Sequence, residues 1–426
     1  MNFANMTLFM MNMVSKTMQR EINDFIKNVK KKQISYTQSA ISKARLKISP
    51  ELFRELNNGL LQDIYEDKEE IKLYRGFRIS GVDGSRLELP NMVIPKDKKQ
   101  SQDIEHIYGK ASNQNGSYAI MPRVSIMYDL ENNLVLDGIL NSLHSSEAFM
   151  AIEHIDQLLN HKKSIKEQYN DLLIYDRGYP SIGLIRYHYN NNLYFLMRVN
   201  NKSFKAVQLF RKSKKTDEIL EVEVTRSILT NLSQEKQHPK LKKVKQELKL
   251  GEKIKVRAIK VVLDSGEVEV LLTSLLSQET YETAMFKELY FKRWGVEIAY
   301  DILKNIFDIE NFTGLTQIAI NQDFLATILT NNICSLIMND VMEEKVVLYN
   351  NQKERKYLYK LNKNFSIGCM KNKLVLMLMK NTHIEKIYDI IEAEIICNLL
   401  PIKPNRSFPR NRKPSTKFPV SKKNGF

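Results

Sequence analysis

The sequence predicts an α/β protein with a mixed five-stranded sheet and helices, interrupted by a β-rich insertion and flanked by helical regions on both sides. Three observations lead to this prediction. Strand and helix patterns follow one another in the middle of the chain, a long charged segment interrupts them, and helical patterns return towards both ends. A chain of 426 residues with 43% hydrophobic residues is long and apolar enough for two or three folded domains.

Residues 1–70 are predicted to be helical in short pieces, among them residues 19–29 and 39–47. Ser49 before Pro50 is typical of a helix N-cap followed by proline at the first helical position. Two short helices joined by a turn would suit a helix-turn-helix reader of a DNA major groove, although a plain helical bundle explains the pattern equally well. The side chains that such a reader would present are Gln38, Ser39, Ser42, Lys43 and Arg45.

Residues 71–200 hold the first part of the predicted sheet. Three strands are followed by a helix, a strand, a second helix and a further strand, at residues 77–82, 124–129, 134–140, 146–158, 172–175, 182–189 and 193–199. Three antiparallel strands that feed parallel ones are the order of a ribonuclease H-like core. We therefore expect the first strand to lie beside the fourth, at the centre of the sheet.

The remainder of the chain divides into four parts. Residues 201–265 are lysine-rich and partly β, and they are too long for a loop, so we expect a subdomain of their own. Residues 266–315 would complete the core, with a strand over 268–276 and a helix after it. Residues 316–400 are apolar and helical, and the tail of residues 401–426 is basic and predicted to be disordered.

The net charge of +16 and the pI near 9.4 favour a polyanionic partner, with nucleic acid as the leading candidate. Basic residues gather at Lys27 and 30–32, at 240–249 and in the tail. No apolar run is expected to reach the length of a membrane span and no leader is recognised, so we expect a cytoplasmic protein. The widely spaced Cys334, Cys369 and Cys397 are expected to be buried, reduced thiols.

Three acidic residues stand at places where they could meet. Asp83 lies in Val82-Asp83-Gly84-Ser85 and Asp176 in Tyr175-Asp176-Arg177-Gly178, each at the end of a predicted strand. An aspartate near a glycine is most often a turn residue, and that alternative stays open for either one alone. If the strands are neighbours, the two acids converge, and Glu297 on the following helix could complete the group. Three adjacent carboxylates would repel one another unless a cation lay between them.

Oxygen ligation by carboxylates is the preference of Mg²⁺, for which Mn²⁺ would substitute. Two such ions could activate a water or a 3′-hydroxyl and stabilise the leaving oxygen of an in-line phosphoryl displacement. Competing chemistries are disfavoured, because the seven histidines show no zinc-ligand spacing and the chain has no phosphate-cradling glycine loop.

Tyr290, Arg293, Glu297 and Lys304 are predicted to project from one face of a single helix, because a helix turns by about 100° per residue. A phenol, a guanidinium, a carboxylate and an ammonium on one face would suit phosphate and metal. An exposed helix with an Arg293–Glu297 pair is the simpler alternative.

The Tyr-x2-Arg-x3-Glu-x6-Lys spacing of these four residues resembles the signature of the DDE transposases of the insertion sequence 4 family. The two aspartate segments resemble that family's aspartate motifs, and the order of the acids, the insertion before the glutamate and the Glu310-Asn311-Phe312-Thr313-Gly314 segment agree with it. The resemblance extends from about residue 15 to about residue 395.

The resemblance implies a DNA transposase that cleaves the ends of an insertion sequence and transfers the 3′ ends to target DNA. Asp83, Asp176 and Glu297 would hold two Mg²⁺ ions in a ribonuclease H-like catalytic core formed by residues 71–200 and 266–315. Tyr290, Arg293, Lys304 and Arg177 would bind DNA phosphates. The region 1–70 would bind the terminal inverted repeats through Gln38, Ser42, Lys43 and Arg45, and the helical region 316–400 would help to pair two subunits.

Two departures from the family pattern remain. Some relatives stack a tryptophan of the insertion on a flipped base during hairpin formation, whereas the single tryptophan here, Trp294, lies inside the signature. Residue 1 falls close to the first amphipathic helix, so the copy is expected to be abbreviated. The rival hypotheses are a remnant that binds DNA ends without cutting and a general ribonuclease H-like nuclease.

Overall fold

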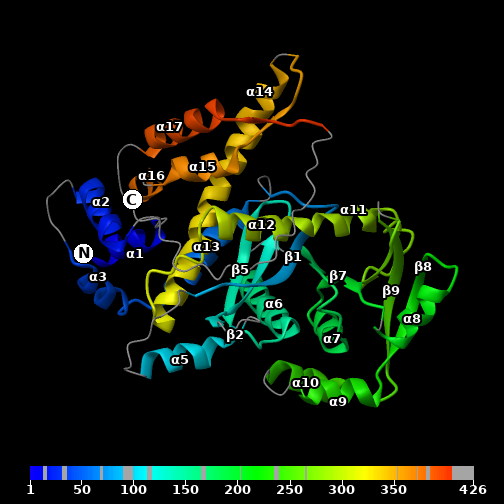
Figure 1. The fold of residues 1–426 in the computed structure, drawn as a ribbon. Helices are drawn as coiled ribbons and strands as arrows, with labels where there is room; N and C mark the ends of the chain where they lie inside the picture. The colour runs from blue at the N-terminus through cyan, green and yellow to red at the C-terminus, as the bar shows by residue number, and fades with distance from the viewer. Residues whose placement is uncertain are drawn as a thin grey trace.

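The computed structural model describes residues 1–12, 17–30, 36–67, 71–89, 99–112, 118–164, 169–201, 203–234, 239–263, 266–352, 354–371, 373–379 and 384–404. A mixed eight-stranded sheet in the strand order β5-β4-β1-β6-β7-β10-β9-β8 forms its centre (Figure 1). Lys31, Lys32 and most of the basic tail lie outside the described residues.

Strand β1 (Phe77–Arg86) is central to the site because it pairs antiparallel with β4 (Arg123–Asp129) and parallel with β6 (Asn170–Tyr175). β4 continues antiparallel to β5 (Leu134–Asn141), and β6 continues parallel to β7 (Tyr194–Val199). The strands and helices predicted between residues 77 and 199 all form, with shifted ends. The first strand does lie beside the fourth predicted one.

The sheet has eight strands where the sequence predicted five. β10 (Val268–Thr273) pairs with β7, and β9 (Lys253–Val262) and β8 (Asp217–Glu223) follow it, all antiparallel. The lysine-rich segment therefore adds β8 and β9 to the same sheet, where they cover a strand edge that would otherwise be left open. Its helices are α8 (Lys205–Lys212), α9 (Arg226–Gln234) and α10 (Pro239–Glu247).

Strand β6 shows why the middle of the sheet reads as a continuous apolar run. Leu173 and Tyr175 pack on one face with α6 (Glu147–Ser164) and α7 (Ile182–Asn190). Leu172 and Ile174 pack on the other face with α11 (Met285–Lys292). Alternate residues of a strand point to opposite faces, so a strand covered on both sides must be apolar throughout. Figure 1 shows these helices on the two sides of the sheet.

The N-terminal helices are α1 (Phe3–Met11), α2 (Met18–Lys30), α3 (Gln38–Arg45) and α4 (Glu51–Glu66). Helix α5 (Lys99–Tyr108) precedes the small hairpin of β2 (Lys110–Ser112) and β3 (Tyr118–Ile120). The long helix α13 (Gln317–Asp340) joins these parts, because it contacts α1, α4 and β5. The N-terminal helices thus pack on the core through α13.

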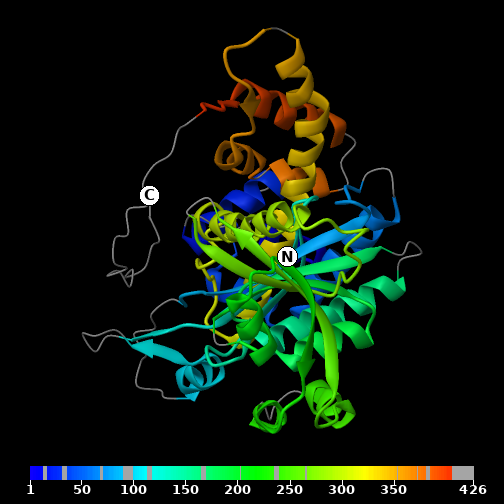
Figure 2. The same cartoon turned by 90° about the vertical axis from the view of Figure 1, so that its right-hand side faces the viewer.

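The C-terminal helices form a lobe beyond one side of the sheet (Figure 2). After α13 come a π-helical segment (Val341–Val346), α14 (Val347–Asn351), β11 (Tyr359–Lys360), α15 (Lys363–Met370), α16 (Lys373–Leu378), α17 (Ile384–Cys397) and β12 (Leu400–Pro401). Of the three cysteines, Cys334 is buried as expected, whereas Cys397 is exposed, which corrects that expectation.

The apolar run Gln317–Asn351 corrects one expectation from the sequence. Among the described residues, this helical run is the one that is long enough and apolar enough to cross a membrane, judged by length and composition alone. However, 72% of its most apolar window is buried inside the protein. The apolar character of this run is accounted for by core packing, because Phe324 and Ile328 of α13 lie in a cluster with residues of β4 and β5.

Candidate active site

The two aspartates follow directly on the last residue pair of the parallel β1–β6 ladder. Val82 of β1 is in register with Tyr175 of β6, and Asp83 and Asp176 are the next residue of each segment. Strand β6 ends before Asp176, whereas β1 continues through Asp83 in its pairing with β4. The Gly84 amide donates a hydrogen bond of 2.8 Å to Asp83 Oδ1. Strand ends in an α/β sheet are where side chains from separate segments converge on a common site.

Helix α12 (Trp294–Asn305) brings Glu297 to the same end of β1. Tyr300 donates a hydrogen bond of 2.9 Å to the Asp83 carbonyl, which ties the helix to the strand. Gly81 permits this close approach, since a Cβ there would lie 3.3 Å from Val296. Acidic residues from three separate segments are therefore held together near one end of the central strands β1 and β6.

The Arg293 guanidinium lies among these acids. Its Nη2 donates a hydrogen bond of 2.8 Å to Glu297 Oε1, and its Nη1 lies 3.9 Å from Asp83 Oδ2. It also interacts electrostatically with Asp176. The side chain is only 5% exposed. Arg293 thus provides a positive charge to all three carboxylates.

A second set of side chains holds Asp176. Arg198 Nε donates a hydrogen bond of 2.8 Å to Asp176 Oδ1, and the Tyr290 hydroxyl donates one of 3.2 Å to the same oxygen. Burial opposes ionisation, but the Arg177 amide, Arg198 and Arg293 outweigh it, so the pKa of Asp176 lies below its usual value. Asp176 is consequently ionised at neutral pH.

Asp83 has the opposite electrostatic environment. Burial raises the pKa of its carboxyl to about 6, although the Gly84 amide and Arg293 act against that rise. The negative charges of Asp176 and Glu297 raise the pKa further. The neighbouring Asp83 and Asp176 therefore differ in pKa, because burial dominates at Asp83 whereas hydrogen bonds and nearby arginines dominate at Asp176.

The donor set fits a hard divalent cation, because it offers carboxylate oxygens from three segments. In the part of the chain that the structure describes, no group of three or more His, Cys, Asp or Glu side chains is close enough to enclose an ion. The three acids face Arg293 instead, so metal binding would require the Glu297 carboxylate to exchange its bond to Arg293 for the ion.

The signature residues do not lie on a single continuous helix, contrary to the sequence prediction. Helix α11 ends at Lys292 and α12 begins at Trp294, with Arg293 as the junction between them. The junction is tight, because the Arg293 amide bonds to the Tyr290 carbonyl and the Val296 amide bonds to the Arg293 carbonyl. The backbone stays right-handed at Arg293, so Tyr290, Arg293 and Glu297 still face the strand ends.

The remaining predicted phosphate ligands differ in their surroundings. Lys304 Nζ donates hydrogen bonds to Ser85 Oγ at 2.8 Å and to the Arg86 carbonyl at 2.7 Å. Burial lowers the pKa of Lys304, and Glu310 offsets this only in part. Arg177 is half exposed and bonds to Glu269 at 3.1 Å. Lys304 lies at the end of β1, whereas Arg177 lies beside Asp176.

Among the side chains predicted to contact the DNA ends, Arg45 was predicted wrongly, because it is buried. It is 2% exposed and donates hydrogen bonds to Gln322 at 2.8 Å and to Asp323 at 2.5 Å. Arg45 therefore anchors α3 to α13 and cannot reach DNA in this conformation. Gln38 and Lys43 are exposed and Ser42 is half-buried, so these three stay candidates.

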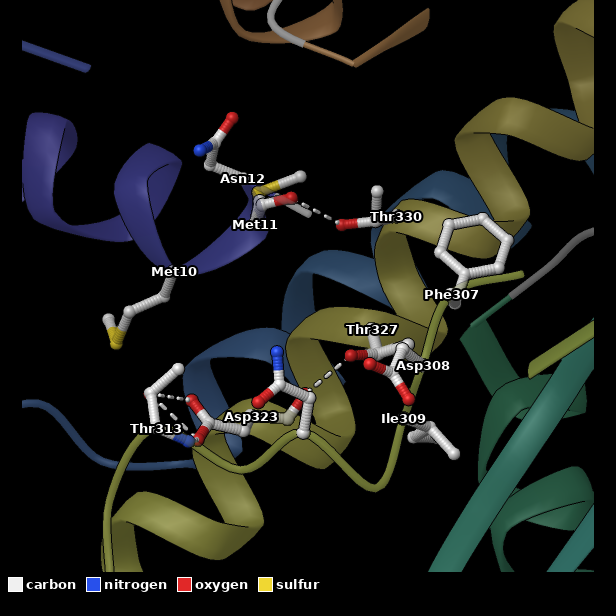
Figure 3. Close-up of a pocket in the computed structure, with 11 residues that line it drawn as sticks. Met10, Met11, Asn12, Phe307, Asp308, Ile309, Thr313, Asp323, Thr327 and Thr330 are labelled. Carbon is white, nitrogen blue, oxygen red and sulfur yellow. Dashed lines mark hydrogen bonds between the residues drawn. The ribbon is translucent and has the colours of Figure 1, made fainter. Parts of the chain in front are cut away.

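Figure 3 shows the surroundings of this anchor, a small cavity of about 40 Å³ between α1, the segment after α12 and α13. Asp323 accepts the Thr313 amide at 2.6 Å, and Thr330 donates to the Met11 carbonyl at 3.2 Å. Thr313 belongs to the Glu310–Gly314 segment that agreed with the family pattern. In this structure that segment holds the N-terminal helices rather than the carboxylates.

Sequence reasoning missed several residues around the acids, namely Arg198, Tyr300, Arg123 and Glu147. Each lies on a strand or helix remote in sequence from the two aspartate motifs, and only Tyr300 falls within a recognised motif, at a variable position of the signature. The charge of Arg198 in the otherwise apolar strand β7 is the one signal that could have drawn attention.

A family model for the transposase DDE domain matches residues 78–333, which run from β1 into α13 and include Asp83, Asp176 and Glu297. The chain belongs to the DDE transposase family. No curated protein matches it. Among solved structures, it is similar to the piggyBac transposase in a cryo-EM synaptic complex with hairpin DNA, with 11% identity and a TM-score of 0.35 over 92% of this chain and 75% of that one.

Proposed function

We propose that this DDE transposase acts on an insertion sequence of the insertion sequence 4 type. It binds the terminal inverted repeats, cleaves the ends by two-metal phosphodiester hydrolysis and transfers the 3′ ends to target DNA. One observation carries the proposal: the register of β1 and β6 brings Asp83 and Asp176 together, with Glu297 on the helix that packs against β1. We infer that the half-sheet β5-β4-β1-β6-β7 corresponds to a ribonuclease H-like core.

The carboxylates of Asp83, Asp176 and Glu297 would hold two Mg²⁺ ions, for which Mn²⁺ would substitute. When bound, the metal supplies an activated oxygen nucleophile and stabilises charge on the leaving oxygen. Arg198 and Tyr290 orient the Asp176 carboxylate through their hydrogen bonds to Oδ1. Tyr300 keeps the Asp83 backbone against α12, so that these donors stay aligned.

Arg293, Lys304 and Arg177 would bind DNA phosphates near the cleaved bond, since guanidinium and ammonium groups are the strong phosphate donors. The excess of 65 basic over 49 acidic residues supplies longer-range attraction for DNA. Gln38, Ser42 and Lys43 of α3 would contact the inverted repeats. Two copies paired on two ends, in the bacterial cytoplasm and on the nucleoid, would complete the reaction.

The test is strand cleavage of a duplex that carries the repeats flanking the chain's own coding region. With Mg²⁺, the wild-type protein is expected to nick at the repeat ends. Glu297→Gln removes a carboxylate charge while conserving size, and it is expected to abolish cleavage and leave DNA binding in EDTA within about twofold of wild type.

The outcomes separate the proposal from its rivals. Retained cleavage by Glu297→Gln contradicts the proposed site. Binding without any cleavage by the wild type would favour a DNA-end-binding remnant. Cleavage that ignores the repeats would favour a general ribonuclease H-like nuclease.

A further inference from the structure

The end of the sheet carries a positively charged cavity to which the DDE signature contributes only Lys304. It measures about 350 Å³ and lies directly after Asp83 on β1. Its lining residues are Gly84, Ser85, Arg86, Arg123, Glu147 and Lys304. Among the described residues that line it, three are cations and one is an anion, so the cavity bears a positive surplus.

The register of the sheet concentrates this charge. Arg86 of β1 pairs directly with Arg123 of β4 in the antiparallel ladder, so the two side chains point to the same face. Like charges directly opposite each other in a sheet are destabilising unless an anion lies nearby. Lys304 reaches the same strand end through its bond to the Arg86 carbonyl.

Glu147, at the start of α6, neutralises only part of this charge. Its Oε1 accepts a hydrogen bond of 3.1 Å from Arg123 Nη1. The Arg123 Nε is buried and has no hydrogen-bond partner among the residues that the structure describes. Arg123 is therefore held in place by Glu147 while part of its donor capacity stays unused.

Both aspartate motifs make room for the Glu147 carboxylate. A Cβ on Gly84 would lie 3.4 Å from Glu147 Oε1, and a Cβ on Gly178 would overlap with Oε2. Neither glycine has the positive φ that demands glycine for backbone reasons. The absence of a side chain at Gly178 is thus explained by the space that Glu147 occupies.

We propose that Arg123, positioned by Glu147 and joined by Arg86 and Lys304, forms a subsite for a DNA backbone phosphate beside the carboxylate site. The proposal deepens the proposed function, on which it rests, by adding residues outside the signature. Arg123 binds the phosphate, and Glu147 is a positioning residue that orients the guanidinium. Glu147 does not contact DNA.

The experiment measures the affinity of the full chain for a fluorescent mixed-sequence duplex in EDTA over a series of KCl concentrations. Each phosphate contact contributes about 0.9 to the slope of log affinity against log salt concentration. Arg123→Gln is expected to reduce the magnitude of that slope by about 0.9, whereas Arg123→Lys should largely retain it. Arg86→Gln, which removes an exposed side chain, provides an independent reading of the same subsite if Arg123→Gln fails to fold.

Arg186→Gln is the matched control. Arg186 forms an ion pair with Glu252 at nearly the same exposure, 22% and 29% of the side chains against 21% and 33% for Arg123 and Glu147. It lies on α7, away from the cavity. The control is expected to leave the salt slope unchanged. The loss of one positive charge would then not by itself explain a smaller slope in Arg123→Gln.

Glu147→Gln separates a positioning role from simple electrostatics. Removing a negative charge near DNA should tighten binding, whereas releasing Arg123 from its partner should weaken it. We expect weaker binding, and Gly178→Ala should act in the same direction by displacing the carboxylate.

Tighter binding by Glu147→Gln, or an unchanged slope for both Arg123→Gln and Arg86→Gln, overturns the subsite while leaving the transposase proposal intact. If the wild-type protein binds no duplex at all, the proposed function fails as well.

Discussion

Two buried arginines, Arg45 and Arg293, differ in how completely their guanidinium groups are hydrogen-bonded. Both are almost inaccessible, at 2% and 4% exposed. Arg45 uses Nε and both terminal nitrogens in hydrogen bonds to Gln322, Thr313, Asp323 and the Ala319 carbonyl. Arg293 donates to Glu297, approaches Asp83 at 3.9 Å and keeps a buried Nε without a partner among the described residues.

The two arginines differ in how many of their guanidinium N–H groups have hydrogen-bond partners, and not in how deeply they are buried. A buried donor without a partner costs on the order of 1–3 kcal/mol, so each such group calls for an explanation, of which a functional role is one. Arg45 joins two helices that need no further ligand. Arg293 faces three carboxylates and stands at the edge of the sheet where DNA would approach, so its incomplete bonding leaves capacity for a phosphate.

The largest expected effect is on catalysis at Arg293. Arg293→Gln removes the guanidinium from the carboxylate site, and we expect cleavage in Mg²⁺ to fall on the order of 10²–10³-fold, as for the loss of one charge-stabilising donor. Single-turnover cleavage of an end-bearing duplex measures this. If Arg45→Gln, assayed at a temperature where it is folded, loses as much activity, the distinction between the two arginines is wrong.

The next effect is on stability at Arg45. Arg45→Gln leaves the partly buried Asp323 without its cation, and we expect the free energy of unfolding to fall by about 3 kcal/mol. Urea denaturation followed by circular dichroism is the measurement. The matched variant Arg54→Gln should lose less, because Arg54 is more exposed than Arg45 and its partner Asp137 keeps a second partner in His154. An Arg45→Gln protein as stable as the wild type would show that the anchor contributes nothing.

A third prediction concerns the response of stability to metal. In Arg293→Gln the three carboxylates lose their internal counter-charge, so the variant should be less stable than wild type in EDTA and gain more from added Mg²⁺ or Mn²⁺. Thermal unfolding with and without metal tests this. Arg45→Gln should show the wild-type metal response, since Arg45 lies on α3 among the residues of α13. Equal metal responses in both variants would contradict a metal site beside Arg293.

The smallest effect is expected at the exposed end of α3. Lys43→Gln should lower the salt slope of binding to the repeat-bearing duplex by about 0.9 and leave stability unchanged, because the side chain is exposed. Fluorescence anisotropy at several salt concentrations measures it. Lys47→Gln, also exposed and just beyond the same helix, is the control. Identical slopes for the two variants would remove α3 as the reader of DNA ends.

Much of the sheet could be predicted because its strands carry strong local signals. The apolar run before Asp176 and the strand before Asp83 were placed correctly, and the expectation that they are neighbours holds. A strand over 268–276 and β structure within 201–265 were predicted, but the pairing of β8, β9 and β10 into the same sheet was not foreseen, since strand pairing joins residues far apart in sequence. The alternating exposure along β8 is typical of a strand with one face in solvent, and this local pattern is also what a separate small domain would show.

The candidate site was less completely predictable. Arg45 looked like an exposed helical arginine because its partners Gln322 and Asp323 lie far along the chain. Arg123, Arg198 and Glu147 were missed for the same reason. Their roles arise from register and helix packing, which a local pattern does not encode.

By itself the sequence determined the order of the acids, the spacing of the signature residues and the excess of positive charge, and these predict the chemistry that we propose. Only the tertiary structure decided which arginine supports the fold, which faces the carboxylates and where Glu147 places Arg123. The physical reason is that the role of a charged side chain depends on the groups that contact it. In this chain those groups come from strands and helices that meet only after folding.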